Sequence, residues 1–334
     1  MVKKIFLAFS LSFVVIFYLV YEVFFDKNDI KTPIEIEIKK GSSKIEIAKL
    51  LKDKNVINNW QIFLLYSLIK GDLKAGFYEF QGNLSINDVF NIIHLGKEKL
   101  IKVTIIPGDN LFIIAEKLEE NNLIKKDEFL KYVFNKENLK KWNLEGASFE
   151  GYFPPETYGF KKNENIDEII NKFLEIFKKR YMPYKEKIEN KGYSEFGIKK
   201  LSFYQAMIIA SMIEKETAIE EEKPIIAGVI LNRLKLNMPL QIDPTVIYAL
   251  YIENKWDGNL TKKDLQIKSD FNTYIKNGVP PTPICSFSIS SLEAVLNPRK
   301  TDYLYYVATK EKYHLFSNDY KTHLKNIQKI YRSK

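Results

Sequence analysis

The segment from Ser202 to Thr217 places two carboxylates at the end of a run that is almost wholly apolar. Residues 203–213 read Phe-Tyr-Gln-Ala-Met-Ile-Ile-Ala-Ser-Met-Ile, and Glu-Lys-Glu follows at 214–216. A helix that is apolar on every side must be buried on every side, so the rest of its domain has to pack around it. Ser202 followed three residues later by Gln205 is a capping-box start. We therefore predict a central helix from about residue 203 to about residue 217.

A carboxyl group in the last turn of such a helix tends to keep its proton. Leaving water disfavours its charged form, and the negative end of the helix dipole does the same. Both effects raise the pKa toward the range of a general acid. Residues two apart on a helix point about 200° apart, so only one of Glu214 and Glu216 can face a given site. The alternative is that both are ordinary solvated residues at a fraying helix end.

The beginning of the chain predicts a membrane anchor. From Ile5 to Phe25 the sequence is apolar except for two serines and the late Glu22, and a run of about twenty residues matches the bilayer core. Lys3 and Lys4 precede the run and Asp26 follows it, which predicts a cytoplasmic N-terminus and an extracytoplasmic remainder. A cleaved signal peptide is the alternative, but its apolar core would be shorter and would end in small residues.

Composition excludes several classes of protein. The formal net charge of +9 comes from lysines scattered along the chain, which is typical of a solvated surface rather than a nucleic-acid groove. Cys285 is the single cysteine, so no internal disulfide can form. The three histidines lie far apart without neighbours at metal-ligand spacing, and no glycine-rich phosphate loop or dinucleotide fingerprint occurs. We predict no metal, no cofactor and no nucleic-acid partner.

An internal repeat lies between the apolar start and the acidic helix. Each copy reads as a strand with alternating apolar residues, a glycine turn and a short amphipathic helix. Such units suit a binding module, although they also serve as compact spacers. The matching residues are Ile38, Gly41, Ile47, Ala48, Leu51, Asn55 and Ile57 in the first copy, and Ile105, Gly108, Ile114, Ala115, Leu118, Asn122 and Ile124 in the second.

A series of motifs resembles the endolytic murein transglycosylases, the YceG-like family, in order and spacing. They are Glu150-Gly-Tyr-Phe-Pro-Pro-Glu-Thr-Tyr158, Ala210-Ser-Met-Ile-Glu-Lys-Glu216, Val229-Ile-Leu-Asn-Arg233, Leu240-Gln-Ile-Asp-Pro-Thr-Val-Ile-Tyr248, Phe271-Asn-Thr-Tyr274, Gly278-Val-Pro-Pro281 and His314-Leu-Phe316. The departures are small: Phe271 stands where Tyr is usual, Ile242 where a small or polar residue is usual, and Thr282 where Gly is expected.

The resemblance implies cleavage of the β-1,4 bond between N-acetylmuramic acid and N-acetylglucosamine within peptidoglycan strands, with formation of a 1,6-anhydro ring. One carboxyl group can protonate the leaving oxygen and then accept the proton of the sugar's C6 hydroxyl. A hydrolase would normally use a second carboxylate. Two alternatives stay open: a non-catalytic wall-binding scaffold, and a hydrolytic muramidase that uses Glu216 together with Asp243.

The resemblance also assigns residues. Glu216, the second acid of Glu-Lys-Glu, matches the family's catalytic position, and Glu214 is the fallback. The alternative role for Glu214 is to bond loop backbone or to pair with Arg233. An N-cap role for Asp243, core packing for the tyrosines and a structural role for His314 are the competing interpretations. The candidate substrate-binding residues are Gln241, Asp243, Thr245, Tyr248, Asn272, Tyr274, Tyr152, Tyr158, Arg233 and His314.

The predicted fold class is α+β, with an N-terminal transmembrane helix and LysM-like modules before a mixed catalytic domain. The expected divisions are 1–26 for the cytoplasmic N-terminus and anchor, 27–99 for a LysM-like module, 100–147 for the second repeat and 148–334 for the catalytic domain. The resemblance further implies a single-pass protein of the bacterial cytoplasmic membrane that works beside peptidoglycan synthases and terminates glycan strands.

Overall fold

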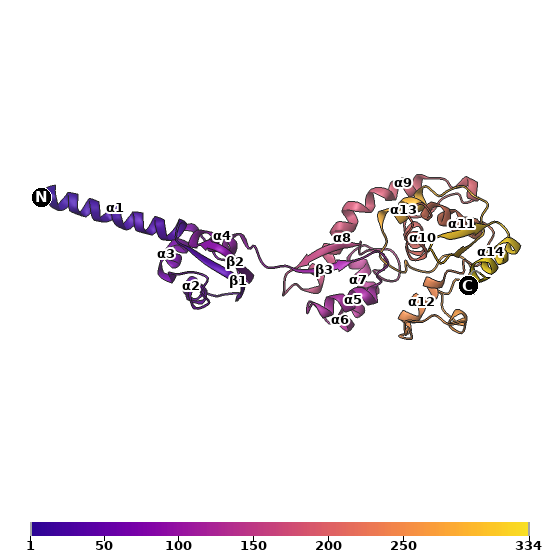
Figure 1. The fold of residues 1–334 in the computed structure, drawn as a ribbon, viewed down its shortest axis with the longest axis horizontal. Helices are drawn as coiled ribbons and strands as arrows, with labels where there is room; N and C mark the ends of the chain where they lie inside the picture. The colour runs from indigo at the N-terminus through magenta and orange to yellow at the C-terminus, as the bar shows by residue number, and fades with distance from the viewer. Residues whose placement is uncertain (1, 333–334) are drawn as a thin grey trace. The chain divides into compact units, whose positions relative to one another are not determined.

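The computed structural model describes residues 2–332 and divides into two compact units (Figure 1). Unit 1 comprises Met1–Ile101 together with Lys161–Asn163, and unit 2 comprises Lys102–Phe160 and Glu164–Lys334. Both units combine helices with two-stranded sheets. The predicted α+β class is therefore confirmed.

Unit 1 packs its helices on one antiparallel pair of strands. Ile36 of β1 lies opposite Tyr78 of β2, and both side chains are buried together with Ile38 and Phe80. The period-two alternation of the strand sequence explains why one face of the pair is buried. The elements are α1 (Val2–Phe24), β1 (Lys27–Ile38), α2 (Lys44–Asp53), α3 (Trp60–Lys70), β2 (Gly76–Ser85) and α4 (Ile86–Leu95).

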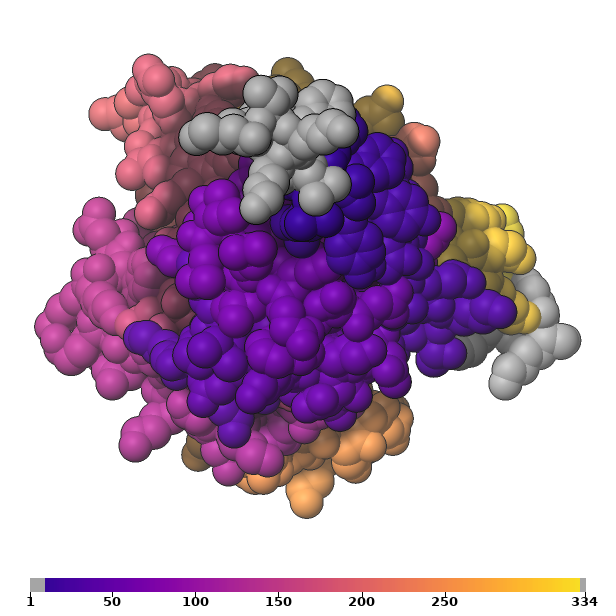
Figure 2. All heavy atoms as spheres, turned by 90° about the vertical axis from the view of Figure 1, so that its left-hand side faces the viewer, coloured from indigo at the N-terminus to yellow at the C-terminus, as the bar shows by residue number. Residues whose placement is uncertain are grey.

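Helix α1 joins the core of unit 1 near its C-terminal end. Val23 is buried, and the ring of Phe24 meets the ring of Tyr66 on α3 edge to face at 6.1 Å. Figure 2, which faces the N-terminal end of the molecule, shows the surface of this unit. Among the described residues, no helix combines the length and the apolar character that crossing a membrane requires.

Unit 2 contains two further strand pairs, β3 with β4 and β5 with β6, and the last two form an antiparallel hairpin. Its elements are β3 (Ile101–Ile105), α5 (Leu111–Glu120), α6 (Lys126–Val133), α7 (Lys136–Lys141), β4 (Glu156–Phe160), α8 (Ile166–Arg180), α9 (Lys185–Asn190), α10 (Phe203–Glu216), α11 (Lys223–Lys235), α12 (Asp243–Ile252), α13 (Ile289–Leu296), β5 (Tyr305–Ala308), β6 (His314–Ser317) and α14 (Tyr320–Arg332).

Helix α10 is the predicted central helix. Every residue from Phe203 to Ile213 except Gln205 is buried, and α9, α11, α12 and α13 all pack against it. Ser202 and Gln205 form the capping box, and the helix ends at Glu216 because Thr217 adopts an extended backbone. The two acids therefore lie in the last turn, where the helix emerges from the core.

The two repeat copies share their local geometry. Gly41 and Gly108 have φ values of 89° and 91°, and Asn55 and Asn122 both have a φ of 56°. These are left-handed conformations that glycine and asparagine adopt with least strain, which explains why these residue types recur. The aligned apolar residues of both helices, Ile47, Ala48 and Leu51 in α2 and Ile114, Ala115 and Leu118 in α5, are buried.

The second repeat does not stand apart from the predicted catalytic domain. Ile105, Ile114 and Leu118 belong to the same hydrophobic cluster as Phe149 and Phe153. One compact unit therefore begins near Lys102. The expected division between residues 147 and 148 is wrong for this reason: apolar residues on both sides of it belong to one hydrophobic core.

Candidate functional site

The two acids at the end of α10 have different surroundings. The Oε2 atom of Glu214 accepts hydrogen bonds from the backbone N–H of Ser288 at 2.8 Å, from the Ser288 hydroxyl at 2.5 Å and from the Ser291 hydroxyl at 2.6 Å. Ser288 is the N-cap of α13, so Glu214 completes the N-terminus of that helix. Its ion-pair partner is Lys223, at 3.7 Å from Oε1, and not Arg233 as one prediction had it.

Glu216 keeps its side chain partly exposed while dense packing surrounds it. Burial raises the pKa of its carboxyl group to about 7. A hydrogen bond with the Tyr306 hydroxyl lowers this pKa, the charge of Asp243 raises it, and the charge of Arg233 lowers it. Glu216 is thus a carboxyl group that can hold a proton near neutral pH and still meet a ligand.

Arg233 joins the segments that surround Glu216. Its Nε donates to the carbonyl oxygen of Leu304 at 2.6 Å, and its Nη1 donates to the carbonyl oxygens of Leu240 at 2.6 Å and Pro239 at 3.1 Å. Its guanidinium lies 5.3 Å from the centre of the Tyr305 ring. The buried guanidinium therefore fixes both the approach to Asp243 and the strand that carries Tyr306.

Asp243 and Tyr274 face each other near Glu216. The Tyr274 hydroxyl donates to Oδ1 of Asp243 at 2.5 Å. Burial and the adjacent Asp243 raise the pKa of Tyr274, and the charge of Glu216 adds to this. The predicted capping role of Asp243 is wrong: Asp243 is the first residue of α12, and Ile242 occupies the N-cap position without a side-chain cap.

A set of hydrogen bonds holds the two loops that carry Asp243 and Tyr274. Thr273 accepts from the backbone N–H of Gln241 at 3.0 Å through its carbonyl oxygen, and from that of Ile242 at 3.0 Å through its hydroxyl. The hydroxyls of Thr245 and Thr273 lie 2.9 Å apart. Gln241 itself is exposed and has a φ of 52°. Thr245 and Thr273 are fully buried, so they position this loop pair rather than contact a ligand.

Asn272 also acts as a support. Its side chain is fully buried, and its Nδ2 donates to the carbonyl oxygens of Leu265 at 3.0 Å and Ile267 at 2.9 Å. Both amide hydrogens are therefore used within the protein. Its Oδ1 accepts from the backbone N–H of Tyr274 at 2.9 Å, so Asn272 braces the loop and has no donor left for the predicted contact with a ligand.

The predicted tyrosines other than Tyr274 lie in the core. Tyr158 is 4% exposed and donates to the carbonyl oxygen of Pro154, and Tyr248 is 2% exposed. Neither offers a ring face on which a sugar could stack, so their interpretation as ligand contacts is wrong. Tyr152 borders a cavity of about 480 Å³ beside residues 203–207 of α10, whereas Glu216 ends that helix.

His314 is held by a carboxylate that the sequence did not single out. Its Nδ1 lies 2.7 Å from Oε2 of Glu222, and its backbone N–H donates to Oε1 at 2.7 Å. The hydroxyl of Thr217 donates to the same carboxylate at 2.9 Å. Burial alone would raise the pKa of Glu222, but these bonds bring it below its ordinary value. The His314 ring also meets Tyr306 edge to face at 5.3 Å.

Sequence reasoning missed three residues of this region. Tyr306 lies in the apolar run Tyr303-Leu-Tyr-Tyr-Val-Ala308 and Glu222 sits among neighbouring acids, so neither has a distinguishing pattern. Glu150 opens the motif Glu150–Tyr158 but is not among the candidate site residues. It is fully buried, accepts from the backbone N–H of Leu111 at 3.0 Å, and burial raises its pKa to about 8. Only the motif around Glu150 could have provided a signal.

Glu216 can donate and accept a proton. The groups near it are the guanidinium of Arg233, the carboxylate of Asp243 and the phenols of Tyr274 and Tyr306. This arrangement can transfer a proton to and from a ligand. Over the residues that the structure describes, no three His, Cys, Asp or Glu side chains converge in a way that could hold a metal ion.

Comparisons with known proteins identify similar chains. The YceG-like family matches residues 36–329. The endolytic murein transglycosylase of Bacillus subtilis (strain 168) is 33% identical over 333 residues, which cover 92% of this chain and 88% of that protein. The endolytic murein transglycosylase of Streptococcus pneumoniae serotype 2 (strain D39) is 30% identical, and the match covers 91% of this chain and 59% of that protein.

A solved structure is also similar. The crystal structure of a YceG-like protein from Listeria monocytogenes superposes with a TM-score of 0.60 at 33% sequence identity. The superposition covers 88% of this chain and 99% of that one.

Proposed function

Because the chain belongs to the YceG-like family, we propose that it is an endolytic murein transglycosylase that cuts peptidoglycan glycan strands. The bond cleaved is the β-1,4 linkage between N-acetylmuramic acid and N-acetylglucosamine, and the product carries a 1,6-anhydro end. The names of the relatives support the activity. The arrangement around Glu216 supports the assignment of residues that follows.

Glu216 is the general acid and then the general base. With a pKa of about 7 it holds the proton that the leaving glycosidic oxygen needs. After donation, the carboxylate of Glu216 accepts the proton of the C6 hydroxyl of N-acetylmuramic acid. The C6 oxygen then bonds to C1 of the same sugar and closes the 1,6-anhydro ring. The observation that carries this assignment is the contrast with Glu214, whose Oε2 already accepts three hydrogen bonds within the protein.

Arg233, Asp243 and Tyr306 lie near Glu216 and set its protonation, and Tyr274 bonds the carboxylate of Asp243. Asp243 holds a negative charge near Glu216 and so favours its protonated form, whereas Arg233 and Tyr306 favour the ionised form. This balance suits a group that must change protonation state twice in each cycle. Gln241 and Asp243, both exposed, are the proposed contacts with the sugar next to the cleaved bond.

The N-terminal segment is the proposed attachment to the cytoplasmic membrane, with the remainder of the chain outside. Its support is the apolar run from Ile5 to Phe25 and the lysines that precede it. An enzyme attached in this way would act on strands near their site of synthesis. Termination of those strands beside peptidoglycan synthases, and LysM-like glycan binding by the repeat units, belong to the same proposal.

Mass spectrometry of purified glycan strands incubated with the protein tests the reaction. We expect new internal cuts with 1,6-anhydro ends, and a loss of about 10²–10⁴-fold in rate for Glu216→Gln, the range that general acid–base groups contribute. Glu214→Gln is the matched control and should keep the chemistry. Reducing ends would establish a hydrolase, absence of product would favour a binding scaffold, and an active Glu216→Gln would refute the assignment.

A further inference from the structure

Between Leu11 and Tyr18, helix α1 exposes apolar side chains in every direction. From Leu11 to Tyr18, its large apolar residues are between 49% and 70% exposed, whereas Leu19 and Val23 farther along pack against the core of unit 1. Phe13, Val14, Val15, Ile16, Phe17 and Tyr18 are consecutive, and six consecutive residues point to all sides of a helix. A groove in a partner protein covers one side of a helix. Lipid covers all sides at once, and this pattern is typical of lipid contact.

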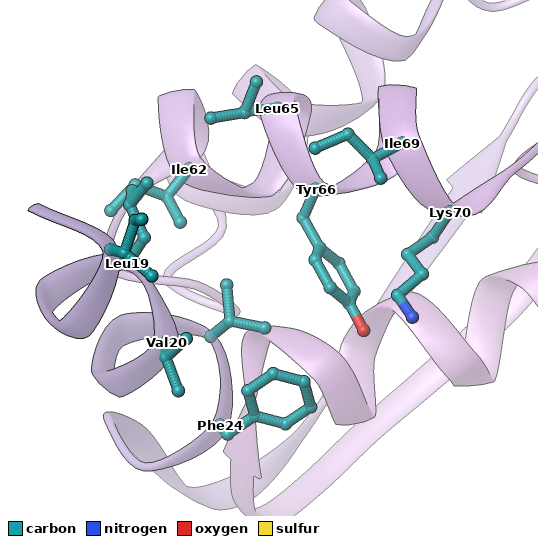
Figure 3. Close-up of a pocket in the computed structure, with 10 residues that line it drawn as sticks. Leu19, Val20, Phe24, Ile62, Leu65, Tyr66, Ile69 and Lys70 are labelled. Atoms are coloured by element: carbon teal, nitrogen blue, oxygen red, sulfur yellow. The ribbon is translucent and has the colours of Figure 1, made fainter. Parts of the chain in front are cut away.

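Helix α3 extends this apolar surface. Leu65, Leu68 and Ile69 are 45%, 62% and 74% exposed, and their spacing of three and four residues places them on one face of the helix. An open cavity of about 250 Å³ lies between the two helices (Figure 3). It is lined by Ile16, Leu19 and Val20 of α1 and by Leu65 and Ile69 of α3, among others.

The edge of this surface carries side chains that suit a boundary between water and hydrocarbon. The Lys70 ammonium lies 5.9 Å from the centre of the Tyr66 ring, and both residues border the cavity. The Tyr66 hydroxyl donates to Asn87 at 2.8 Å. Lysine and tyrosine place an apolar stem or ring beside hydrocarbon and a polar tip in the headgroup layer.

We propose that α3 lies in the membrane interface, with Leu65, Leu68 and Ile69 among the acyl chains and with lipid filling the cavity between α1 and α3. These three residues of α3, with Ile16, Leu19 and Val20 of α1, form the α1–α3 surface. The inference rests on the proposed membrane attachment and goes beyond it: unit 1 is docked on the bilayer through α3 instead of being held away from it by a free linker. A second copy of the chain would cover one side of α1 and leave the others in water.

Spin labels measure the docking directly in the full chain reconstituted in nanodiscs. Cysteine at position 69 or 68 carries the nitroxide, and cysteine at position 52, exposed on α2, is the matched control. Cys285 is buried and free, so introduced thiols are the ones that react. We expect the ratio of oxygen to nickel-chelate accessibility to be several-fold higher at 68 and 69 than at 52.

Two outcomes would overturn the inference. Equal nickel-chelate access at 69 and 52 would show that α3 stands in water. Dipolar broadening at 69 that disappears on dilution with unlabelled chain would show that a second copy occupies the surface. Flotation of the labelled full chain reconstituted in vesicles tests the attachment separately: a chain that floats with a water-exposed label refutes only the docking, and a chain that does not float refutes the attachment as well. Glycan cleavage remains an independent assay.

Discussion

At the scale of single residues, helix geometry assigns different tasks to two identical side chains. Glu214 and Glu216 are two positions apart and so point to different sides of α10. Glu214 accepts hydrogen bonds from Ser288 and Ser291 and so joins α10 to α13. Glu216 lies near Arg233, Asp243 and Tyr306 and has a raised pKa. The difference comes from the surroundings, and it should be measurable as opposite effects on stability.

Replacement of Glu216 by Gln should stabilise the protein at pH 8. Because folding raises the pKa of this carboxyl from 4.5 to about 7, the folded state loses stability as pH rises from 4.5, and the loss is complete above about 7. Gln removes that cost, which we expect to be about 1–2 kcal/mol for a partly exposed group. Urea unfolding at pH 8 measures the gain, which should vanish at pH 4.

Replacement of Glu214 by Gln should instead destabilise the protein at pH 8. The substitution removes the carboxylate whose Oε2 accepts three hydrogen bonds and whose charge faces the buried Lys223. We expect the free energy of unfolding to fall by about 1–3 kcal/mol. The same urea series measures both variants. Effects of equal sign for Glu214→Gln and Glu216→Gln would contradict the division of tasks between the two acids.

Tyr306→Phe should move the alkaline limb of the pH profile. The charged and titratable groups that face Glu216 are Asp243, Arg233, Tyr274 and Tyr306. A general acid must be protonated, so kcat/KM of the natural protein should fall as pH rises above about 7. Without the Tyr306 hydroxyl the pKa of Glu216 rises, and the fall should occur at higher pH.

Tyr305→Phe is the control for that experiment, because Tyr305 packs on Arg233 and its neighbours through its ring, which phenylalanine keeps. The pH profile of this variant should match that of the natural protein. An unchanged alkaline limb in Tyr306→Phe would mean that the Tyr306 hydroxyl does not influence the proton on Glu216.

At the scale of elements, the repeat was predictable because its left-handed backbone conformations require glycine or asparagine at the same places in both copies. Asn55 and Asn122 follow α2 and α5 and share a φ of 56°, and the next residue donates to Leu51 or Leu118 in each case. The helix-ending geometry needs a residue that tolerates the left-handed region. Local requirements of this kind recur wherever the element recurs.

Asn122→Ala should cost about 1 kcal/mol of folding stability, because an alanine Cβ disfavours the left-handed conformation. Asn122→Gly should be within a few tenths of a kcal/mol of the natural protein. Asn122 is exposed, so no packing is lost in either variant. Urea unfolding measures both, with Glu120→Ala on the exposed side of α5 as the control. Equal stability of the alanine and glycine variants would show that the conformation carries no cost.

Elements whose pattern is local were predicted well. The capping box and the start of α10 occur at the expected residues. Asp243 was predicted as a cap on equally local grounds, and this was wrong because a tertiary partner, Tyr274, binds its carboxylate instead. A distant hydroxyl has no signature in the residues next to Asp243.

At the scale of the whole molecule, the sequence predicted the fold class and the helix that carries the site, but not how the site is completed. Glu214 meets Ser288 from 74 residues away, and Glu222 meets His314 from 92 residues away. Such pairs depend on how complete elements pack. The division at residue 148 was wrong for a related reason, since burial of the second repeat against Phe149 and Phe153 is a property of the assembled core.

The loop pair around Thr273 has a consequence for how a ligand is received. Gln241 is held in a left-handed conformation by a backbone hydrogen bond, and Asp243 and Tyr274 are already joined before any sugar arrives. The entropy cost of ordering these groups is therefore incurred when the chain folds, and binding of a glycan requires little further ordering of them. Recognition of a glycan strand at this place should resemble the fit of a rigid template.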